Sequence, residues 1–257
     1  MAGKNIIFIH GMFMTPLCWE EWVPYFKKKG FTAIAPAWPE RDRPIATLRE
    51  AYPDPTLGKL TLTDVLISLT LQIRLMKEKP ILIGHSMGGL IVQLLLRDGL
   101  GEAGVAIDSA PPAGVLSLKW SFLKSNFSMI NPFVSKYRPR EMPFRDFQYA
   151  FVNTLPLLEQ QKAYDRYAVP ESRRIPQESL TATAKIDFSK VHSPLLMIAG
   201  EKDHIIPASL IKTNYQKYQF SPSKTDFKEF PDRVHFLIWQ RGWQEIADYI
   251  LEWLKGV

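Results

Sequence analysis

Short apolar runs alternate along the chain with segments in which apolar residues recur at helical spacing. We predict six strands from the runs at 5–10, 31–35, 81–83, 105–108, 195–199 and 225–230. We predict helices at 16–29, 63–77, 87–97, 207–219 and 242–255. The runs at 6–9 and 195–198 are apolar at every position, which is typical of strands buried on both faces. The alternation predicts an α/β fold built on a mostly parallel sheet of about six strands flanked by helices.

Two segments break this alternation. Residues 39–59 are rich in proline, so we predict a loop there. Residues 113–185 contain no clear strand pattern but carry many prolines and aromatic residues. We predict that this second segment is a helical cap inserted over the functional edge of the sheet, where the strands have their carboxyl ends. The core domain would then comprise residues 1–112 and 186–257, and the cap residues 113–185.

The size and composition fit a single α/β domain with one insertion. The chain has 257 residues, and 46% of them are hydrophobic, which is enough for a full core. The net charge is +6, and residues 113–190, with 12 Lys+Arg and 7 Asp+Glu, carry +5 of it. There is no basic run or zinc-finger spacing, so we expect no nucleic-acid partner. The basic segment is either a solvated surface or a face that attracts an anionic substrate or an acidic partner.

The sequence also limits where the protein works and what it can bind. Cys18 is the only cysteine, which excludes an internal disulfide and a cysteine metal cluster and fits a reducing compartment. No stretch approaches the roughly 18 uninterrupted apolar residues of a membrane span, and the apolar run at 6–9 is too short for a signal peptide. We therefore expect a cytoplasmic protein with no membrane span. Aromatic residues exposed on the cap could support a homodimer.

The most informative motif is Gly84-His85-Ser86-Met87-Gly88, which lies between a predicted strand and a predicted helix. This order of strand, sharp turn and helix is the context in which G-x-S-x-G forms a nucleophile elbow. The serine at the apex must adopt a strained backbone conformation, and the flanking glycines leave room for the neighbouring strand and helix. The following helix directs its positive end toward a developing oxyanion. We predict Ser86 as a catalytic nucleophile.

A nucleophilic serine needs a base to accept its proton and a carboxylate to orient that base. Of the five histidines, His235 is the one in a late loop after the last predicted strand, and we predict it as the base. Asp203 follows the buried run at 195–199 and is the predicted acid. Asp108, at the end of the fourth predicted strand, is the rival acid, and Glu201 is a weaker candidate.

The loop at 10–13, which ends the first predicted strand, is suited to bind an oxyanion. Acyl transfer develops negative charge on a carbonyl oxygen, and preorganised N–H donors stabilise that charge. We predict the backbone amides of Met12 and Met87 as these donors. Backbone donors make no demand on the side chains, so ordinary methionines can occupy both positions. We expect His10 to hold the loop and not to react.

With these motifs the chain resembles the α/β-hydrolase superfamily, in its capped, serine esterase and lipase-like form. The positions that carry the resemblance are 10–11, 84–89, 200–203 with Pro207, and His235. The resemblance covers the whole chain and implies a Ser-His-Asp triad, a cap that closes the pocket, and neither a metal nor an organic cofactor. Serine at the elbow argues against epoxide hydrolases and haloalkane dehalogenases of this fold, which use an aspartate. One departure is Val234, where the family often has a glycine before the base.

The leading hypothesis is a serine hydrolase that cleaves a small, fairly apolar carboxylic ester through an acyl-enzyme. Phe13 and Met14 are the predicted lining of an apolar acyl pocket, although the same residues could simply pack in the core. One alternative is a thioesterase or a hydroxynitrile-lyase-like enzyme on the same triad, with the basic cap binding an acidic carrier protein. Another is a ligand receptor that keeps the triad but turns over very slowly.

Overall fold

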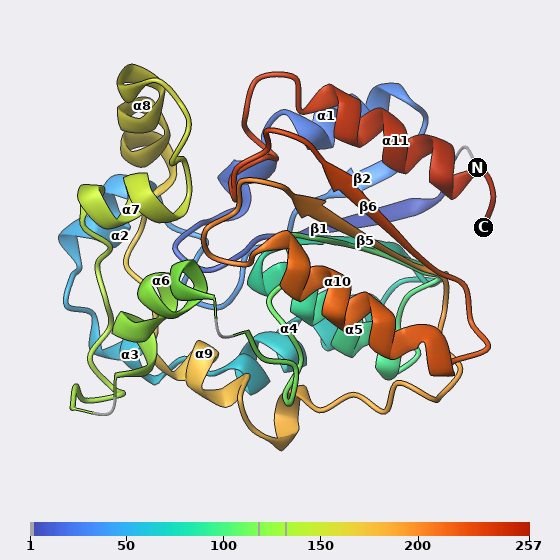
Figure 1. The fold of residues 1–257 in the computed structure, drawn as a ribbon, viewed down its shortest axis with the longest axis horizontal. Coiled ribbons are helices and arrows are strands. Elements are labelled where there is room, and N and C mark those ends of the chain that lie inside the picture. The colour runs from blue at the N-terminus through green and yellow to red at the C-terminus, as the bar shows by residue number, and fades with distance from the viewer. Residues whose placement is uncertain (1–2, 118, 132) are drawn as a thin grey trace.

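The computed structural model describes residues 3–117, 119–131 and 133–257 (Figure 1). Within these residues six strands form one sheet: β1 (Asn5–Ile9), β2 (Thr32–Ile34), β3 (Ile81–His85), β4 (Ala103–Ile107), β5 (Leu195–Gly200) and β6 (Thr225–Phe230). All neighbouring strands are parallel, in the order β2-β1-β3-β4-β5-β6. A parallel sheet flanked by helices confirms the predicted fold class.

The sheet separates two hydrophobic clusters, because successive side chains of a strand point to opposite faces. In β1, Ile6 and Phe8 pack on one side, and Ile7 and Ile9 pack on the other. The first face is covered by α1 (Trp22–Lys28) and α11 (Gln244–Leu254) (Figure 1). The second face is covered by α4 (Leu62–Arg74), α5 (Met87–Arg97) and α10 (Ala208–Lys217), which is followed by the 3-10 helix η3 (Tyr218–Phe220). Burial on both sides explains why whole strands are apolar.

Two predictions of local structure need correction. The helix predicted at 16–29 is two elements, the 3-10 helix η1 (Pro16–Trp19) and α1. The loop predicted at 39–59 contains two short helices, α2 (Ile45–Glu50) and α3 (Pro55–Lys59). Asp54 caps α3 by accepting the N–H groups of Thr56 and Leu57. Pro55 occupies the first helical position, where a proline starts a helix instead of breaking it.

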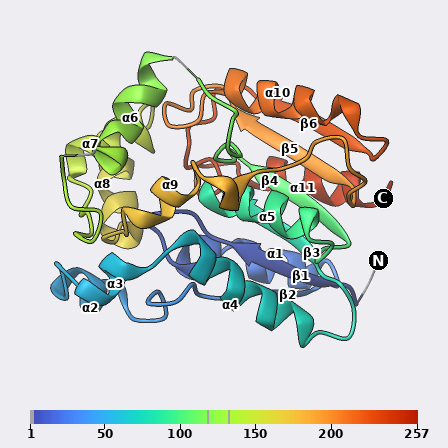
Figure 2. The same cartoon turned by 90° about the horizontal axis from the view of Figure 1, so that it is seen from below.

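A long helical segment, residues 113–185, lies between β4 and β5, and we call it the β4–β5 segment. Its elements are α6 (Trp120–Ile130), α7 (Phe144–Ala150), α8 (Leu157–Tyr167), α9 (Arg174–Glu178) and the 3-10 helix η2 (Ala182–Ala184). Figures 1 and 2 show α6, α7 and α8 beyond the carboxyl ends of the strands, on the side opposite the two chain termini. None of the described helices is long and apolar enough to cross a bilayer.

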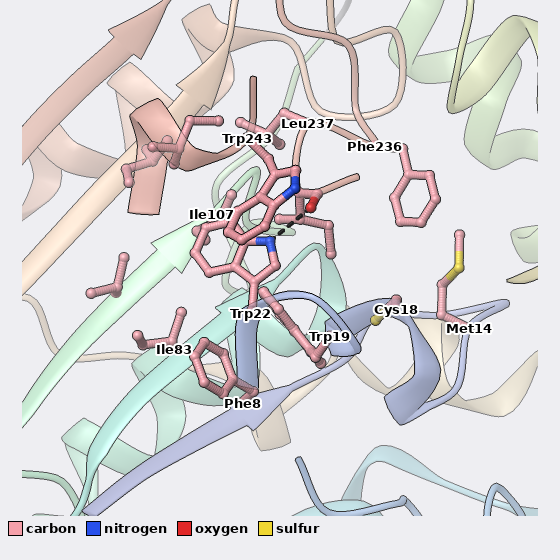
Figure 3. Close-up of a cluster of buried hydrophobic side chains, with 14 of the residues drawn as sticks. Phe8, Met14, Cys18, Trp19, Trp22, Ile83, Ile107, Phe236, Leu237 and Trp243 are labelled. Carbon is pink, nitrogen blue, oxygen red and sulfur yellow. Dashed lines mark hydrogen bonds between the residues drawn. The ribbon is translucent and has the colours of Figure 1, made fainter. Parts of the chain in front are cut away.

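Buried aromatic side chains join α1 and α11 to the loop after β6 (Figure 3). The ring of Trp22 stacks on that of Trp243, with 5.3 Å between centroids, and Phe8 of β1 meets Trp22 edge to face. The indole Nε1 of Trp22 donates a hydrogen bond to the carbonyl oxygen of Ile238 at 2.7 Å (Figure 3). This bond fixes the turn that directly follows His235, so the core holds the loop of the predicted base.

Candidate active site

Ser86 lies at the apex of the turn between β3 and α5, with a backbone φ of +59° and ψ of −120°. This conformation is unfavourable for a residue with a side chain, and the close packing around it maintains the strain. A Cβ on Gly84 would lie 2.1 Å from the carbonyl oxygen of Gly88, and a Cβ on Gly88 would lie 2.2 Å from that of Ile9. The two glycines of the motif are therefore required by space, and the strained turn between strand and helix lies where the sequence predicts it.

The structure brings His235 and Asp203 together. Nδ1 of His235 donates to Oδ2 of Asp203 at 2.6 Å, and both side chains are completely buried. The other oxygen of Asp203 accepts the N–H groups of Ile205 and Ile206 at 2.7 and 2.8 Å, which fixes the carboxylate. A proton on Nδ1 leaves Nε2 of His235 as the free basic nitrogen, and this atom has no hydrogen-bond partner among the described residues. This is the tautomer that a general base requires.

Ser86 lies against the loop after β1. A Cβ on Gly11 would lie 2.8 Å from Cβ and 3.4 Å from Oγ of Ser86, so the two loops touch at this glycine. Oγ makes no hydrogen bond to Nε2 of His235 in this conformation. Catalytic hydrogen bonds are often long or poorly aligned before substrate binds.

The loop of His235 is closed by the side chain of Gln240. Its Oε1 accepts the N–H of Val234 at 3.1 Å, and its Nε2 donates to the carbonyl oxygen of Asp232 at 3.0 Å. Asp232, with φ of +56°, takes the left-handed conformation in this loop. Val234, which stands where the family often has glycine, is itself fully buried. The valine side chain therefore packs in the interior at this position.

His85 supports the same loop from the elbow. Its Nε2 donates to the carbonyl oxygen of His235 at 2.7 Å, and the two rings lie 4.8 Å apart. Burial, and then the nearby His235, hold the pKa of His85 well below its usual value, so the ring is neutral. The sequence gives no signal for this role beyond the place of the histidine inside the elbow motif.

Asp108, the rival acid, has a different environment. It is fully buried at the end of β4, and its Oδ1 accepts the N–H of Gly200 at 2.7 Å. Burial, and then the negative charge of Asp203, raise the pKa of Asp108 well above its usual value. The raised pKa favours the protonated form of Asp108, and it is Asp203 that meets Nδ1 of His235. Glu201 is exposed and accepts the N–H of Asp232 at 3.0 Å.

One group of side chains is close enough to hold a metal ion. Ligand atoms of His85, Asp108 and His235 all lie within 4.8 Å of one another in the part of the chain that the structure describes. His85 and Asp108 already make hydrogen bonds to backbone groups of the base and acid loops. We interpret the cluster as support for these loops, and the expectation that no metal is needed stays a prediction.

Two backbone amides are available near Ser86. Met87 begins α5, and Met12 follows Gly11 in the loop after β1. Neither N–H donates to an acceptor in the described residues. An unpaired N–H at the first position of a helix also carries the positive end of the helix dipole. Both predicted oxyanion donors are thus free to bind a ligand oxygen.

His10 holds the same loop. Its Nδ1 donates to the carbonyl oxygen of Gly11 at 2.8 Å, and its Nε2 accepts the N–H of Trp38 at 3.4 Å. The ring also stacks on Trp38, with 4.2 Å between centroids. Burial, with a smaller effect from the charge of Arg41, lowers the pKa of His10 to about 3. These contacts agree with the expected role of His10.

The predicted pocket residues Phe13 and Met14 are both buried in the cluster on the α1 face of the sheet. The β4–β5 segment adds contacts that sequence reasoning missed. The ring of Phe151 packs edge to face on His235, with 5.1 Å between centroids. The carbonyl oxygen of Phe151 accepts the N–H of Phe236 at 3.0 Å. The segment therefore places an aromatic ring against the predicted base.

Comparison with known families agrees with this geometry. The sequence profile described as the alpha/beta hydrolase family matches residues 6–249. The chain belongs to the alpha/beta hydrolase family. No curated protein sequence matches the chain.

Solved structures resemble this alpha/beta hydrolase along its whole length. An extracellular alpha/beta-hydrolase from a Paenibacillus species is 20% identical with a TM-score of 0.71, over 97% of this chain and 98% of that one. A methylesterase from Arabidopsis is 14% identical with a TM-score of 0.69, over 99% and 100%. A monoacylglycerol lipase from Paleococcus ferrophilus is 18% identical with a TM-score of 0.66, over 98% and 96%. At these identities the likeness shows the fold, and a cytoplasmic location stays a prediction.

The low pKa of His10 makes a prediction for the stability of this alpha/beta hydrolase. Because His10 titrates near 3 when folded and near 6.5 when unfolded, the unfolded chain takes up the proton first as pH falls. The free energy of unfolding should therefore decrease below about pH 6.5, by about 2 kcal/mol at pH 5 from this residue alone. The variant His10→Asn keeps an amide that can donate to Gly11 but has no group that titrates. Between pH 7 and pH 5, its free energy of unfolding should therefore fall by about 2 kcal/mol less than that of the wild type. Urea unfolding at both pH values measures this, and equal losses would contradict a buried neutral His10.

Proposed function

We propose that the chain is a serine hydrolase that cleaves a small, fairly apolar carboxylic ester through an acyl-enzyme. The observations that carry this proposal are the buried pair of His235 and Asp203, 2.6 Å apart, and the strained backbone of Ser86. A buried histidine whose free nitrogen is basic and whose other nitrogen is fixed by a carboxylate is suited to activate an alcohol. Membership in the alpha/beta hydrolase family supports the same chemistry.

In the acylation step, Oγ of Ser86 attacks the ester carbonyl carbon while Nε2 of His235 accepts the hydroxyl proton. Asp203 stabilises the imidazolium that forms and keeps its ring oriented. The tetrahedral intermediate then collapses, the carbon–oxygen bond to the leaving group breaks, and His235 returns the proton to the departing alcohol. A water molecule repeats the sequence on the acyl-enzyme, which releases the acid and the free serine.

The negative charge of both tetrahedral intermediates would be bound by the amides of Met12 and Met87. Their N–H groups have no other acceptor in the described residues, so they need not exchange one hydrogen bond for another. Removing one such donor typically raises the barrier by about 2.7–4 kcal/mol. The start of α5 adds a favourable dipole at the same point.

The proposed substrate class follows from the apolar residues that adjoin the proposed catalytic groups in the sequence or the structure. Phe13, Met14, Met87 and Phe151 are all buried and apolar, and Phe151 packs directly on His235. We assign the β4–β5 segment as the cap, because it supplies Phe151 and lies beyond the carboxyl ends of the strands (Figure 1). A methylesterase and a monoacylglycerol lipase are among the proteins of similar structure. These residues favour an apolar acyl group of modest length.

Labelling with a fluorophosphonate, together with turnover of p-nitrophenyl esters from acetate to decanoate, tests the proposal. We expect one label per chain, on Ser86, and multiple turnovers with the highest kcat/KM for short acyl chains. Stoichiometric labelling without multiple turnover of any ester would instead indicate a ligand receptor. Faster hydrolysis of acyl thioesters that falls steeply with salt would favour a thioesterase whose basic cap binds an acidic carrier. A maximum at the longest acyl chains would contradict a small substrate.

A further inference from the structure

The β4–β5 segment is hydrogen-bonded to the loop of the proposed oxyanion donor Met12 through one residue, Phe13. The N–H of Val169 donates to the carbonyl oxygen of Phe13 at 3.0 Å. The N–H of Phe13 donates to Oε2 of Glu171, also at 3.0 Å. Phe13 has a φ of +62°, a conformation that is rare for an aromatic residue and that its surroundings must maintain. Both backbone groups of Phe13 are thus held by a segment more than 150 positions away.

Glu171 is itself firmly placed. Its own N–H and carbonyl oxygen are both paired with Arg140, at 2.7 Å each, in an isolated antiparallel bridge. Its side chain is fully buried, and Oε1 accepts the N–H of Ser172 at 2.7 Å and meets Nη2 of Arg41 at 2.5 Å. A carboxylate that accepts so many donors has little freedom to move. It can therefore impose its position on the amide of Phe13.

Arg41 supplies the positive charge that makes this burial possible. Its side chain is fully buried, and none of its three guanidinium nitrogens has a hydrogen-bond partner among the described residues, so its contact with Glu171 is an ion pair. A buried ion pair is weak evidence for stability, because the desolvation cost offsets most of the attraction. The pair is better explained by the backbone group that its carboxylate holds. Arg41 also cancels the negative charge of Glu171. An uncancelled carboxylate would oppose the negative charge that must develop in the proposed oxyanion hole.

We infer that Glu171 is a positioning residue for the oxyanion hole. Its carboxylate holds Phe13 in the left-handed conformation, and this orients the preceding amide, that of Met12, toward the substrate oxygen. The inference rests on the proposed function, in which Met12 is an oxyanion donor. Its consequence is that the β4–β5 segment does more than cover the site, because the donor is correctly placed only while Glu171 is docked.

The test compares the wild type with the double variant Arg41→Met/Glu171→Met, which removes the carboxylate without leaving an unpaired buried charge. We expect kcat for the best p-nitrophenyl ester to fall by roughly 10- to 100-fold, below the 10²- to 10³-fold cost of losing a whole donor. KM should change by less than about threefold, because the ground-state ester is bound elsewhere. The Ki of a trifluoromethyl ketone, which forms a serine hemiketal with an oxyanion, should rise in parallel with the loss of kcat.

A matched control removes a different ion pair between the core and the β4–β5 segment. Arg166 of α8 pairs with Glu20, and among the described residues neither makes a hydrogen bond or ion pair to the loop of Met12. We expect Glu20→Gln/Arg166→Gln to keep the kcat and Ki of the wild type. A loss of kcat in this control as large as in the test variant would overturn the inference, because it would assign the effect to docking of the segment in general.

Hydrogen exchange of the Phe13 amide gives a readout that does not depend on turnover. In the wild type this amide should be protected by Glu171, and in the Arg41→Met/Glu171→Met variant it should exchange at least about tenfold faster.

Should the double variant not fold, Glu171→Gln replaces it in the test, because the single acceptor oxygen of the amide cannot bind Phe13, Ser172 and Arg41 together. An active wild type with unchanged kcat and Ki in the variant overturns this inference alone. A wild type that hydrolyses no ester overturns the proposed function.

Discussion

Replacing Ser86 with alanine is expected to lower kcat for p-nitrophenyl butyrate by roughly 10⁴-fold or more, because the reaction loses the atom that attacks the carbonyl. The fold should remain intact. Alanine keeps the Cβ and the φ of +59° that the elbow already accommodates, and only Oγ is removed. We therefore expect the free energy of unfolding to change by less than about 1 kcal/mol. Steady-state kinetics and urea unfolding measure the two quantities.

Ser193→Ala provides the matched control for that substitution. The hydroxyl of Ser193 donates to the carbonyl oxygen of Gly101 at 2.7 Å, next to the start of β5 and away from the carboxyl ends of the strands. This variant should keep the turnover of the wild type. Turnover by Ser86→Ala within tenfold of the wild type would rule out the acyl-enzyme mechanism.

Asp203→Asn is expected to lower kcat by roughly 10⁴-fold, the cost of presenting an amide to the base in place of a carboxylate. The amide cannot stabilise the imidazolium, and it favours the tautomer in which Nε2 of His235 carries the proton and is no longer basic. Asp108→Asn should cost less than about tenfold. Because the raised pKa favours the protonated form of Asp108, an asparagine resembles that form in charge and shape. Parallel kinetics of the two variants measure the ranking.

The pH dependence of stability offers an independent check on Asp108. Its folded pKa lies above its unfolded value, so the folded protein retains a proton that the unfolded chain loses. This lowers the free energy of unfolding progressively above about pH 4. Asp108→Asn removes the effect, so its stability relative to the wild type should rise with pH above that point.

A reversed ranking of kcat, with Asp108→Asn less active than Asp203→Asn, would transfer the role of the acid to Asp108.

The sheet and the elbow could be predicted because their signals are local. Strands buried on both faces are apolar at every position, and α5 occupies 87–97 as the spacing predicts. The elbow follows from two glycines whose missing Cβ atoms make room for neighbouring backbone. The helix α3 was missed because its start signal, a capping Asp54 before Pro55, also occurs in proline-rich loops.

The support of the site could not be predicted in the same way. Arg41 and Glu171 are separated by 130 positions, and nothing in either neighbourhood indicates the partner. The choice between Asp108 and Asp203 likewise depends on which oxygen reaches Nδ1 of His235, because both residues follow buried strands. Such contacts depend on how distant loops pack, and a single sequence does not record this.

The hydrogen bond from the indole of Trp22 to Ile238 gives the enzyme a built-in optical reporter. The emission of a buried indole shifts when its hydrogen bond or its stacking partner changes, and Trp22 also stacks on Trp243. Displacement of the 236–239 turn during the catalytic cycle would therefore change the intrinsic fluorescence. Stopped-flow measurements could then follow events at the imidazole in the unmodified protein, without a chromogenic substrate.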